Sequence, residues 1–177
     1  MRLKMTKQLN KVFETCSAKS LPAQTTALVE FAAQLASGRE GGFNIPKLTR
    51  EVGSIDKLHR VACLCACTGG AIIGERFMKA VSKERSEGGG QLSAKMFGEC
   101  STETLDKKTH HLVSLAACLA SGCECASGHI VEARNAGATE EEIVRCACIT
   151  ACVAGIRVKY AFLAHLEETR GCRSCAC

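Results

Sequence analysis

Two cysteines and a histidine lie within a few residues of one another in the stretch "SGCECASGHIVEARNAG" (121–137). Cys125 and His129 are four residues apart, which places them one turn apart on the same face of a helix. An imidazole in that position can accept the thiol proton or pair with the thiolate. Together with Cys123, these residues suit thiol redox chemistry. They also suit metal binding, because thiolates and imidazoles are the usual ligands of zinc.

The two cysteines stand where one helix ends and the next begins. Gly122 is expected to end the first helix, so Cys123 and Cys125 lie near the start of the second. The free N–H groups at a helix start stabilise an anion, and we therefore predict a lowered pKa for these thiols. A peroxide would convert Cys125 to a sulfenic acid, and Cys123 would condense with it to a disulfide.

The elements that position this stretch are predicted to be helices. The segment 107–122 carries apolar residues at the 3–4 spacing of an amphipathic helix, namely Leu112, Leu115, Ala116 and Leu119. Gly137 is expected to end the short helix that follows the cysteines. Thr139 and Glu142 then have the spacing of a capping box and predict the start of a third helix.

The same pattern occurs twice in the chain. Residues 21–53 align without a gap with residues 105–137, and both contain the sequence Leu-Ala-Ser-Gly. After one inserted residue, 58–77 align with 143–162. Self-similarity of this kind predicts a tandem duplication of one helical unit.

The duplication predicts the domain organisation. We expect a degenerate repeat at about 21–81 and a repeat carrying the site at 105–168. The charged, Gly-rich segment 82–91 is the predicted linker, and 171–177 form a cysteine-rich tail. Because repeats this small usually pack on each other, residues 1–177 are predicted to form a single all-α domain, a helical bundle with internal pseudo-symmetry.

Residues that the two repeats do not share are free to have a functional role. The second repeat alone carries four polar residues that face apolar or unrelated residues in the first: His111, Cys123, Cys125 and His129. His110 is expected to face solvent. The remaining cysteines of the repeats are expected to be small buried residues, as free cysteines often are, namely Cys63, Cys65, Cys67, Cys118, Cys146, Cys148 and Cys152.

Composition narrows the possible classes of protein. Hydrophobic residues make up 46% of the chain and aromatic residues only 4%, which favours closely packed helices over a β-sandwich. The net charge of +5 is spread along the chain without a basic run, so we expect no nucleic-acid partner. The longest apolar run is too short to span a bilayer, and the first residues lack the apolar region of a signal peptide. We therefore expect a cytoplasmic protein whose 14 cysteines are not a disulfide framework.

Residues 105–165, with their "GC", their "C…H" spacing and their "GATEEEI" (137–143), resemble the carboxymuconolactone decarboxylase superfamily, especially its alkylhydroperoxidase D-like branch. Residues 21–77 resemble it more faintly. The resemblance implies an all-α bundle that assembles into homo-oligomers, either trimers of two-repeat chains or hexamers of single-repeat chains. It also implies thiol-dependent peroxide reduction without a cofactor. The substrate would be a hydroperoxide, and a dithiol protein or a lipoyl-type donor would supply the electrons.

The resemblance assigns roles to individual residues. By match with the family motif, Cys125 attacks the peroxide, Cys123 resolves the product and His129 relays protons. The chain departs from the motif at two places. The family has Cys-x-x-Cys where this chain has Cys-x-Cys, whose disulfide closes a tighter and more easily reduced ring. His111 also stands where the family has a Glu, and a histidine can still transfer a proton.

Two other functions remain open from the sequence. One is binding of zinc or another thiophilic metal by Cys123, Cys125 and His129, with a further ligand from Cys118 or from the tail. The tail cysteines, Cys172, Cys175 and Cys177, suit either a metal or a mobile dithiol that reduces the core pair. The other is a redox-sensing member of the family, in which the cysteine pair is oxidised once without turnover.

Overall fold

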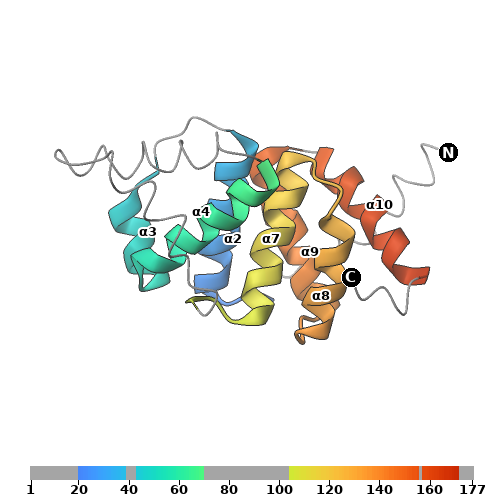
Figure 1. Ribbon diagram of the computed structural model, residues 1–177, viewed down its shortest axis with the longest axis horizontal. Coiled ribbons are helices and arrows are strands. Elements are labelled where there is room, and N and C mark those ends of the chain that lie inside the picture. The colour runs from blue at the N-terminus through green and yellow to red at the C-terminus, as the bar shows by residue number, and fades with distance from the viewer. Residues whose placement is uncertain (1–19, 39–42, 70–103, 156, 172–177) are drawn as a thin grey trace.

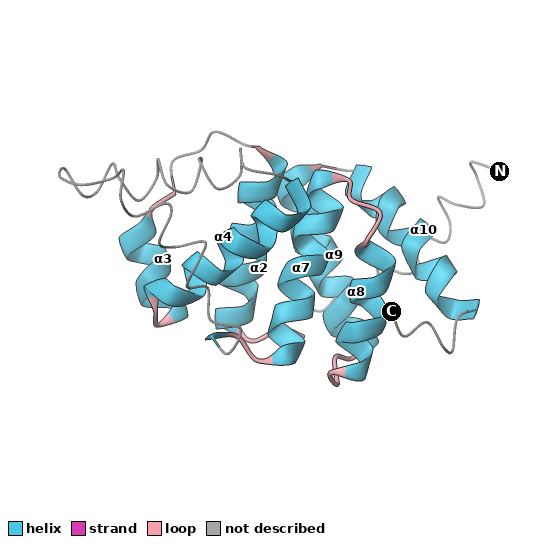
Figure 2. Cartoon of the chain, in the orientation of Figure 1, coloured by secondary structure: helices cyan, strands magenta, loops and turns pink. Residues whose placement is uncertain are grey.

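The computed structural model describes residues 20–38, 43–69, 104–155 and 157–171. The described residues form seven helices and no strand, which confirms the predicted all-α class (Figure 2). The predicted linker 82–91 lies outside the described residues, as do the tail cysteines, Cys172, Cys175 and Cys177. No helix of the described part has both the length and the hydropathy needed to cross a membrane.

The ranges of the two predicted repeats divide the described helices into two sets. The first set is α2 (Ala23–Ser37), α3 (Ile45–Val52) and α4 (Ile55–Gly69). The second set is α7 (Lys107–Ser121), α8 (Ala126–Asn135) and α9 (Glu140–Ala154), followed by α10 (Arg157–Gly171). Helices α2, α4, α7 and α9 each have 15 residues. Between the two sets, helix α2 packs on α9 and α7 packs on α4.

Helix α7 lies at the centre of the bundle. Figure 1 shows it between α2 and α4 on one side and α8, α9 and α10 on the other. Every residue from Leu112 to Ala120 is buried, so the predicted amphipathic pattern is wrong for this segment. The reason is that α7 contacts helices all around it and has no solvent-facing side there. Its many small side chains, such as Ala116 and Ala117, let these neighbours approach closely.

The end of α7 is a turn that requires glycine. Gly122 has a φ of 80°, in the left-handed region that a side chain rarely tolerates. The backbone N–H groups of Gly122 and Cys123 both donate to the carbonyl of Cys118, at 2.8 and 2.9 Å. This arrangement ends the helix where the sequence predicted and reverses the chain into α8.

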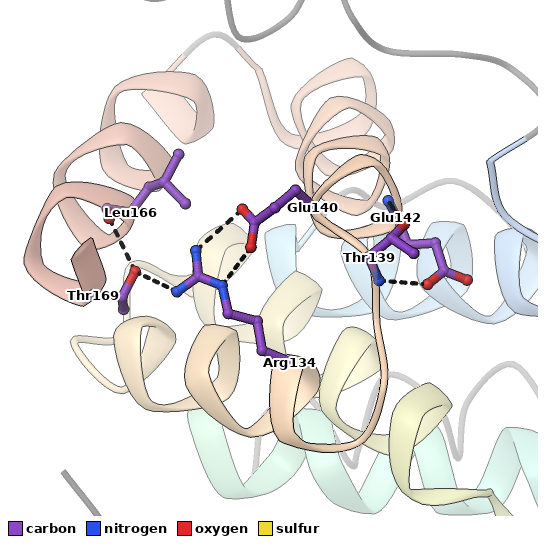
Figure 3. Close-up of polar contacts among 6 residues, drawn as sticks. All are labelled: Arg134, Thr139, Glu140, Glu142, Leu166 and Thr169. Atoms are coloured by element: carbon purple, nitrogen blue, oxygen red, sulfur yellow. Dashed lines mark hydrogen bonds and ion pairs between the residues drawn. The ribbon is translucent and has the colours of Figure 1, made fainter. Parts of the chain in front are cut away.

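The start of α9 is the predicted capping box (Figure 3). Thr139 Oγ1 accepts from the backbone N–H of Glu142 at 3.2 Å, and Glu142 Oε2 accepts from the backbone N–H of Thr139 at 2.8 Å. The other carboxylate oxygen of Glu142 accepts a hydrogen bond from Lys108 Nζ of α7 at 2.8 Å, which is also an ion pair. Glu142 therefore closes the first turn of α9 and also links α9 to the central helix.

The end of α8 is held by Arg134 (Figure 3). Its guanidinium forms a two-point ion pair with Glu140 at the start of α9. Arg134 Nη1 also donates to Thr169 Oγ1 of α10 at 3.0 Å, and that hydroxyl donates to the carbonyl of Leu166 at 2.9 Å. One side chain therefore joins α8 to two neighbouring helices.

The cysteines of the helices are buried only in part. Cys65, Cys118 and Cys146 are fully buried and Cys63 is nearly so, as expected, while Cys148 is half-buried. Cys67 and Cys152 are exposed, which contradicts the expectation of burial. Both lie in the last turn of their helix. Among the described residues, burial ends at Cys65 in α4 and at Ala151 in α9, so these last turns face solvent.

Replacement of Thr139 tests the contribution of the capping box. Thr139→Ala removes the acceptor for the Glu142 N–H, and the free energy of unfolding should fall by about 1 kcal/mol in urea titration. Thr49→Ala is the control, because it changes a threonine of α3 whose side chain makes no hydrogen bond among the described contacts. An equal loss in both variants would show that the cap is not the cause.

Candidate site of three thiols and a histidine pair

Cys123 is the cysteine whose surroundings favour the thiolate. It follows Gly122 in the turn between α7 and α8 and is half-buried. The backbone N–H of Cys125 lowers the pKa of the Cys123 thiol most, by hydrogen bonding to the sulfur. The thiols of Cys125 and Cys118 lower it further, against the opposing effects of partial burial and of the Glu124 carboxylate. The sulfur thus uses a free N–H at the start of a helix, as an N-cap oxygen does.

Cys125 directly precedes α8 and is exposed. Its backbone is already helical, with φ −70° and ψ −1°, and its side chain makes no capping hydrogen bond. The hydrogen bond with Cys123 and the charge of the Cys123 thiolate raise the pKa of the Cys125 thiol. The prediction of a lowered thiol pKa is therefore confirmed for Cys123 and wrong for Cys125. The cause is that the helix-start N–H points to the sulfur of Cys123.

Cys118 is a third thiol beside this pair. It lies in the last turn of α7 and is fully buried. Burial raises the pKa of its thiol most, and the neighbouring Cys123 raises it further, partly through a hydrogen bond between the two side chains. The sequence correctly predicted its burial but not this contact. The detectable signal was the spacing of Cys118 and Cys123 across Gly122, since a helix that ends on glycine brings these two positions together.

His111 of α7 and His129 of α8 face each other. Their Nδ1 atoms are 3.3 Å apart, and the ring centroids are 5.6 Å apart with the planes tilted by 39°. That distance is within hydrogen-bonding range, and the tautomers of the two rings decide which Nδ1 donates and which accepts. The sequence had singled out both residues, but nothing in it paired them. We call His111 and His129 the histidine pair, and Cys118, Cys123 and Cys125 the thiol cluster.

Burial keeps the histidine pair neutral at pH 7. Desolvation lowers the pKa of His111 and of His129, and Glu132 opposes that shift in both. Glu132 was not predicted as part of the site. It lies three residues after His129 on the same helix, so a His-x-x-Glu pattern could have indicated it.

His110 is half-buried rather than solvent-facing, contrary to the sequence-based expectation. Its ring meets that of His111 edge to face, with centroids 4.9 Å apart. Burial first, and then the nearby His111 and Arg60, lower the pKa of His110 to about 4. Its imidazole is therefore neutral at physiological pH.

The thiols and the histidines form two neighbouring groups rather than one. Among the described contacts, no hydrogen bond joins the imidazole of His129 to the thiol of Cys125. The two residues are linked instead by the backbone hydrogen bond from the His129 N–H to the Cys125 carbonyl, 3.3 Å long. The expected thiol–imidazole pair is therefore not formed. Proton transfer between the groups would need a bridging substrate or solvent molecule.

The described residues predicted to bind a metal do not converge on one point. Within the described ranges, no three His, Cys, Asp or Glu side chains converge as they would around a metal ion. Cys123 and Cys125 lie together, but His129 faces His111 instead. Binding of zinc by Cys123, Cys125 and His129 therefore gains no support from the described residues.

Part of the chain that includes the site matches a known protein family. Residues 90–168 match the model of the carboxymuconolactone decarboxylase family. No curated protein and no solved structure shows a significant match to the chain. The matched region contains the whole thiol cluster and the whole histidine pair.

The lowered pKa of His110 predicts a loss of stability in acid. The unfolded histidine titrates near 6.5 and the folded one near 4, so between these values the unfolded chain binds more protons. The free energy of unfolding should therefore hold above about pH 6.5 and fall as the pH drops towards 4.

Because His110 is partly solvated, we expect its share of this loss to be on the order of 1 kcal/mol. Urea titrations of the wild type and of His110→Gln at pH 7 and pH 5 measure it. The variant should lose less stability between the two pH values than the wild type. The same loss in both proteins would show that His110 has no part in it.

Proposed function

Because residues 90–168 belong to the carboxymuconolactone decarboxylase family, we propose that the protein is a thiol-dependent peroxide reductase of the alkylhydroperoxidase D type. The observation that carries the proposal is the environment of Cys123. Its sulfur receives the Cys125 N–H and lies beside two further thiols. A stabilised thiolate next to a second thiol is what peroxide reduction by cysteine requires.

The first step is attack of the Cys123 thiolate on one oxygen of the hydroperoxide. A sulfur–oxygen bond forms, the O–O bond breaks, and the alkoxide leaves and takes a proton to become an alcohol. The thiol pKa values support Cys123 as the attacking residue. The family motif assigns this role to Cys125, so the proposed order of the two cysteines is reversed in this chain.

The second step turns the sulfenic acid into a disulfide. The sulfur of a neighbouring thiol, Cys125 in the predicted pair, attacks the sulfur of oxidised Cys123, and the hydroxyl leaves as water. The exposed Cys125 is where a dithiol protein or a lipoyl-type donor would reach the site and restore both thiols.

The histidine pair would move protons for these steps. His111 and His129 share one proton between their Nδ1 atoms, and each keeps an Nε2 atom for exchange with substrate or water. Since burial lowers both pKa values, the neutral pair can accept the thiol proton and return it to the leaving alkoxide. The pair thus takes the place of the family's Glu, where His111 stands.

A redox sensor is the alternative to an enzyme. The shortened Cys-x-Cys spacing favours it, because the pair departs from the family's Cys-x-x-Cys arrangement, for which turnover is expected. A sensor would consume one equivalent of peroxide and stop, whereas an enzyme continues as long as reductant is present.

Replacement of Cys123 tests the proposed function. With an organic hydroperoxide and dihydrolipoamide in excess, the wild type should consume peroxide at a steady rate, and Cys123→Ser should fall to the rate without protein. Cys152→Ser, an exposed cysteine of α9 outside the thiol cluster, is the control and should keep the wild-type rate. Wild-type turnover by Cys123→Ser would refute the assignment, and a single turnover of the wild type would indicate the sensor.

Replacement of the histidines tests the proton transfer. His111→Gln and His129→Gln should each lower kcat/KM about 100-fold, the usual contribution of a general acid or base. Burial lowers the pKa of both histidines from the usual 6.5. Protonation of the pair should therefore slow the wild-type reaction only below about pH 6.5. His165→Gln on α10 is the control and should keep the wild-type rate. Unchanged pH–rate profiles in both variants would exclude a proton-transfer role.

A further inference from the structure

We infer that Cys118 is the thiol that first condenses with oxidised Cys123, so that the site works with three thiols rather than two. The inference rests on the proposed function for its chemistry. It adds a resolving residue that lies inside the core, five residues before Cys123 and outside the Cys-x-Cys pair.

The geometry of the helix end brings Cys118 and Cys123 together. The N–H of Cys123 donates to the carbonyl of Cys118 at 2.9 Å, across the left-handed Gly122. In this type of helix end, the side chain of the residue after the glycine packs against the side chain of the residue four positions before the glycine. These two positions are Cys123 and Cys118. The two thiols are close enough to shift each other's pKa, that of Cys118 upward and that of Cys123 downward.

Cys118 is also better fixed than Cys125. Its side chain is fully enclosed by the core, and its backbone belongs to the buried part of α7. The Cys125 side chain is exposed and makes no capping bond, so it has more freedom to lose on forming a disulfide. A Cys123–Cys125 disulfide would also close the tighter ring. The raised pKa of Cys118 keeps it protonated and able to donate to the Cys123 thiolate.

The reaction balances with two of these thiols and one molecule of hydroperoxide. Peroxide oxidises the Cys123 thiolate to a sulfenic acid and leaves as an alcohol. The Cys118 sulfur then attacks the Cys123 sulfur, the S–S bond forms, the S–O bond breaks, and the hydroxide leaves with the Cys118 proton as water. The two thiols have then given up the two electrons that the peroxide gained.

Thiol exchange then carries the disulfide to the surface. The Cys125 thiolate attacks the Cys123 sulfur, the bond to Cys118 breaks, and the Cys118 thiolate takes up the proton that Cys125 released. This exchange moves no net electrons. An external dithiol reduces the resulting Cys123–Cys125 disulfide at the exposed Cys125, which the buried Cys118 could not offer.

Cleavage after Glu124 distinguishes the two disulfides. Reduced protein is treated anaerobically with one equivalent of an organic hydroperoxide, blocked with N-ethylmaleimide, digested with a glutamyl endopeptidase and analysed by mass spectrometry. Because Glu124 separates Cys123 from Cys125, a Cys123–Cys125 disulfide leaves two peptides joined across the cut. A Cys118–Cys123 disulfide leaves Cys125 on a separate, alkylated peptide.

The decisive variant is Cys125→Ser, which leaves the core unchanged. We expect it to lose two thiols per equivalent of peroxide and to yield the Cys118–Cys123 disulfide. In the wild type this disulfide should appear first and the Cys123–Cys125 disulfide later. If Cys125→Ser stops at a Cys123 sulfenic acid that a 1,3-dione captures, with Cys118 alkylated, the inference is overturned and the proposed function stands.

A second oxidant separates failure of the inference from failure of the proposed function. Oxidised glutathione reacts with a thiolate by exchange, so it tests the pairing of thiols without peroxide. If peroxide leaves the wild-type thiols intact, the proposed function fails. The pairing then stands if glutathione produces the Cys118–Cys123 disulfide in Cys125→Ser, and it falls if Cys123 remains glutathionylated.

Cys146 offers a matched control for removal of a buried thiol. Like Cys118 it is fully buried, and burial raises the pKa of its thiol to about 12. In the Cys125→Ser background, Cys118→Ala should leave Cys123 as a persistent sulfenic acid, whereas Cys146→Ala should still form the Cys118–Cys123 disulfide. Persistence in both variants would attribute the effect to a loosened core and overturn the assignment of Cys118.

Discussion

Burial of α7 on every side is the constraint on which the rest of the structure depends. From Leu112 to Ala120 no side chain of this helix reaches solvent, because the helices of both predicted repeats and α10 pack around it. A helix enclosed in this way cannot rotate or slide without opening cavities in the core. Its two ends therefore hold fixed positions, with His111 near one and Cys118 near the other, and α8 completes the site against them.

Helix α8 is in turn fixed at both of its ends. Its start follows the glycine turn at Gly122, which decides where Cys123 and Cys125 lie. Its end is held by Arg134, whose ion pair and hydrogen bond reach α9 and α10 (Figure 3). Because His129 lies between these two fixed points, its ring is held facing His111 on the neighbouring helix α7. Rigid placement of this kind is what proton and thiol transfer require.

The distribution of charge in the thiol cluster follows from competition for hydrogen-bond donors. The backbone N–H of Cys125 at the helix start stabilises the sulfur of Cys123. Once Cys123 carries the charge, Cys118 and Cys125 are held as thiols by its proximity, and Cys118 by burial as well. The proposed nucleophile and its proposed partners thus differ in environment rather than in residue type.

The helical class, the end of α7 at Gly122 and the capping box at Thr139 were predictable from the sequence, because each depends on local residue types and spacing. The sequence also singled out His111, Cys123, Cys125 and His129, since the first repeat lacks them. Only the tertiary structure decided which of these residues meet. Which sulfur receives the helix-start N–H depends on the backbone conformation of the turn between α7 and α8, and the contact between His111 and His129 depends on how α7 and α8 pack. Neither can be read from the spacing of the residues, because the first depends on the conformation of the turn after Gly122 and the second on how α8 packs against α7.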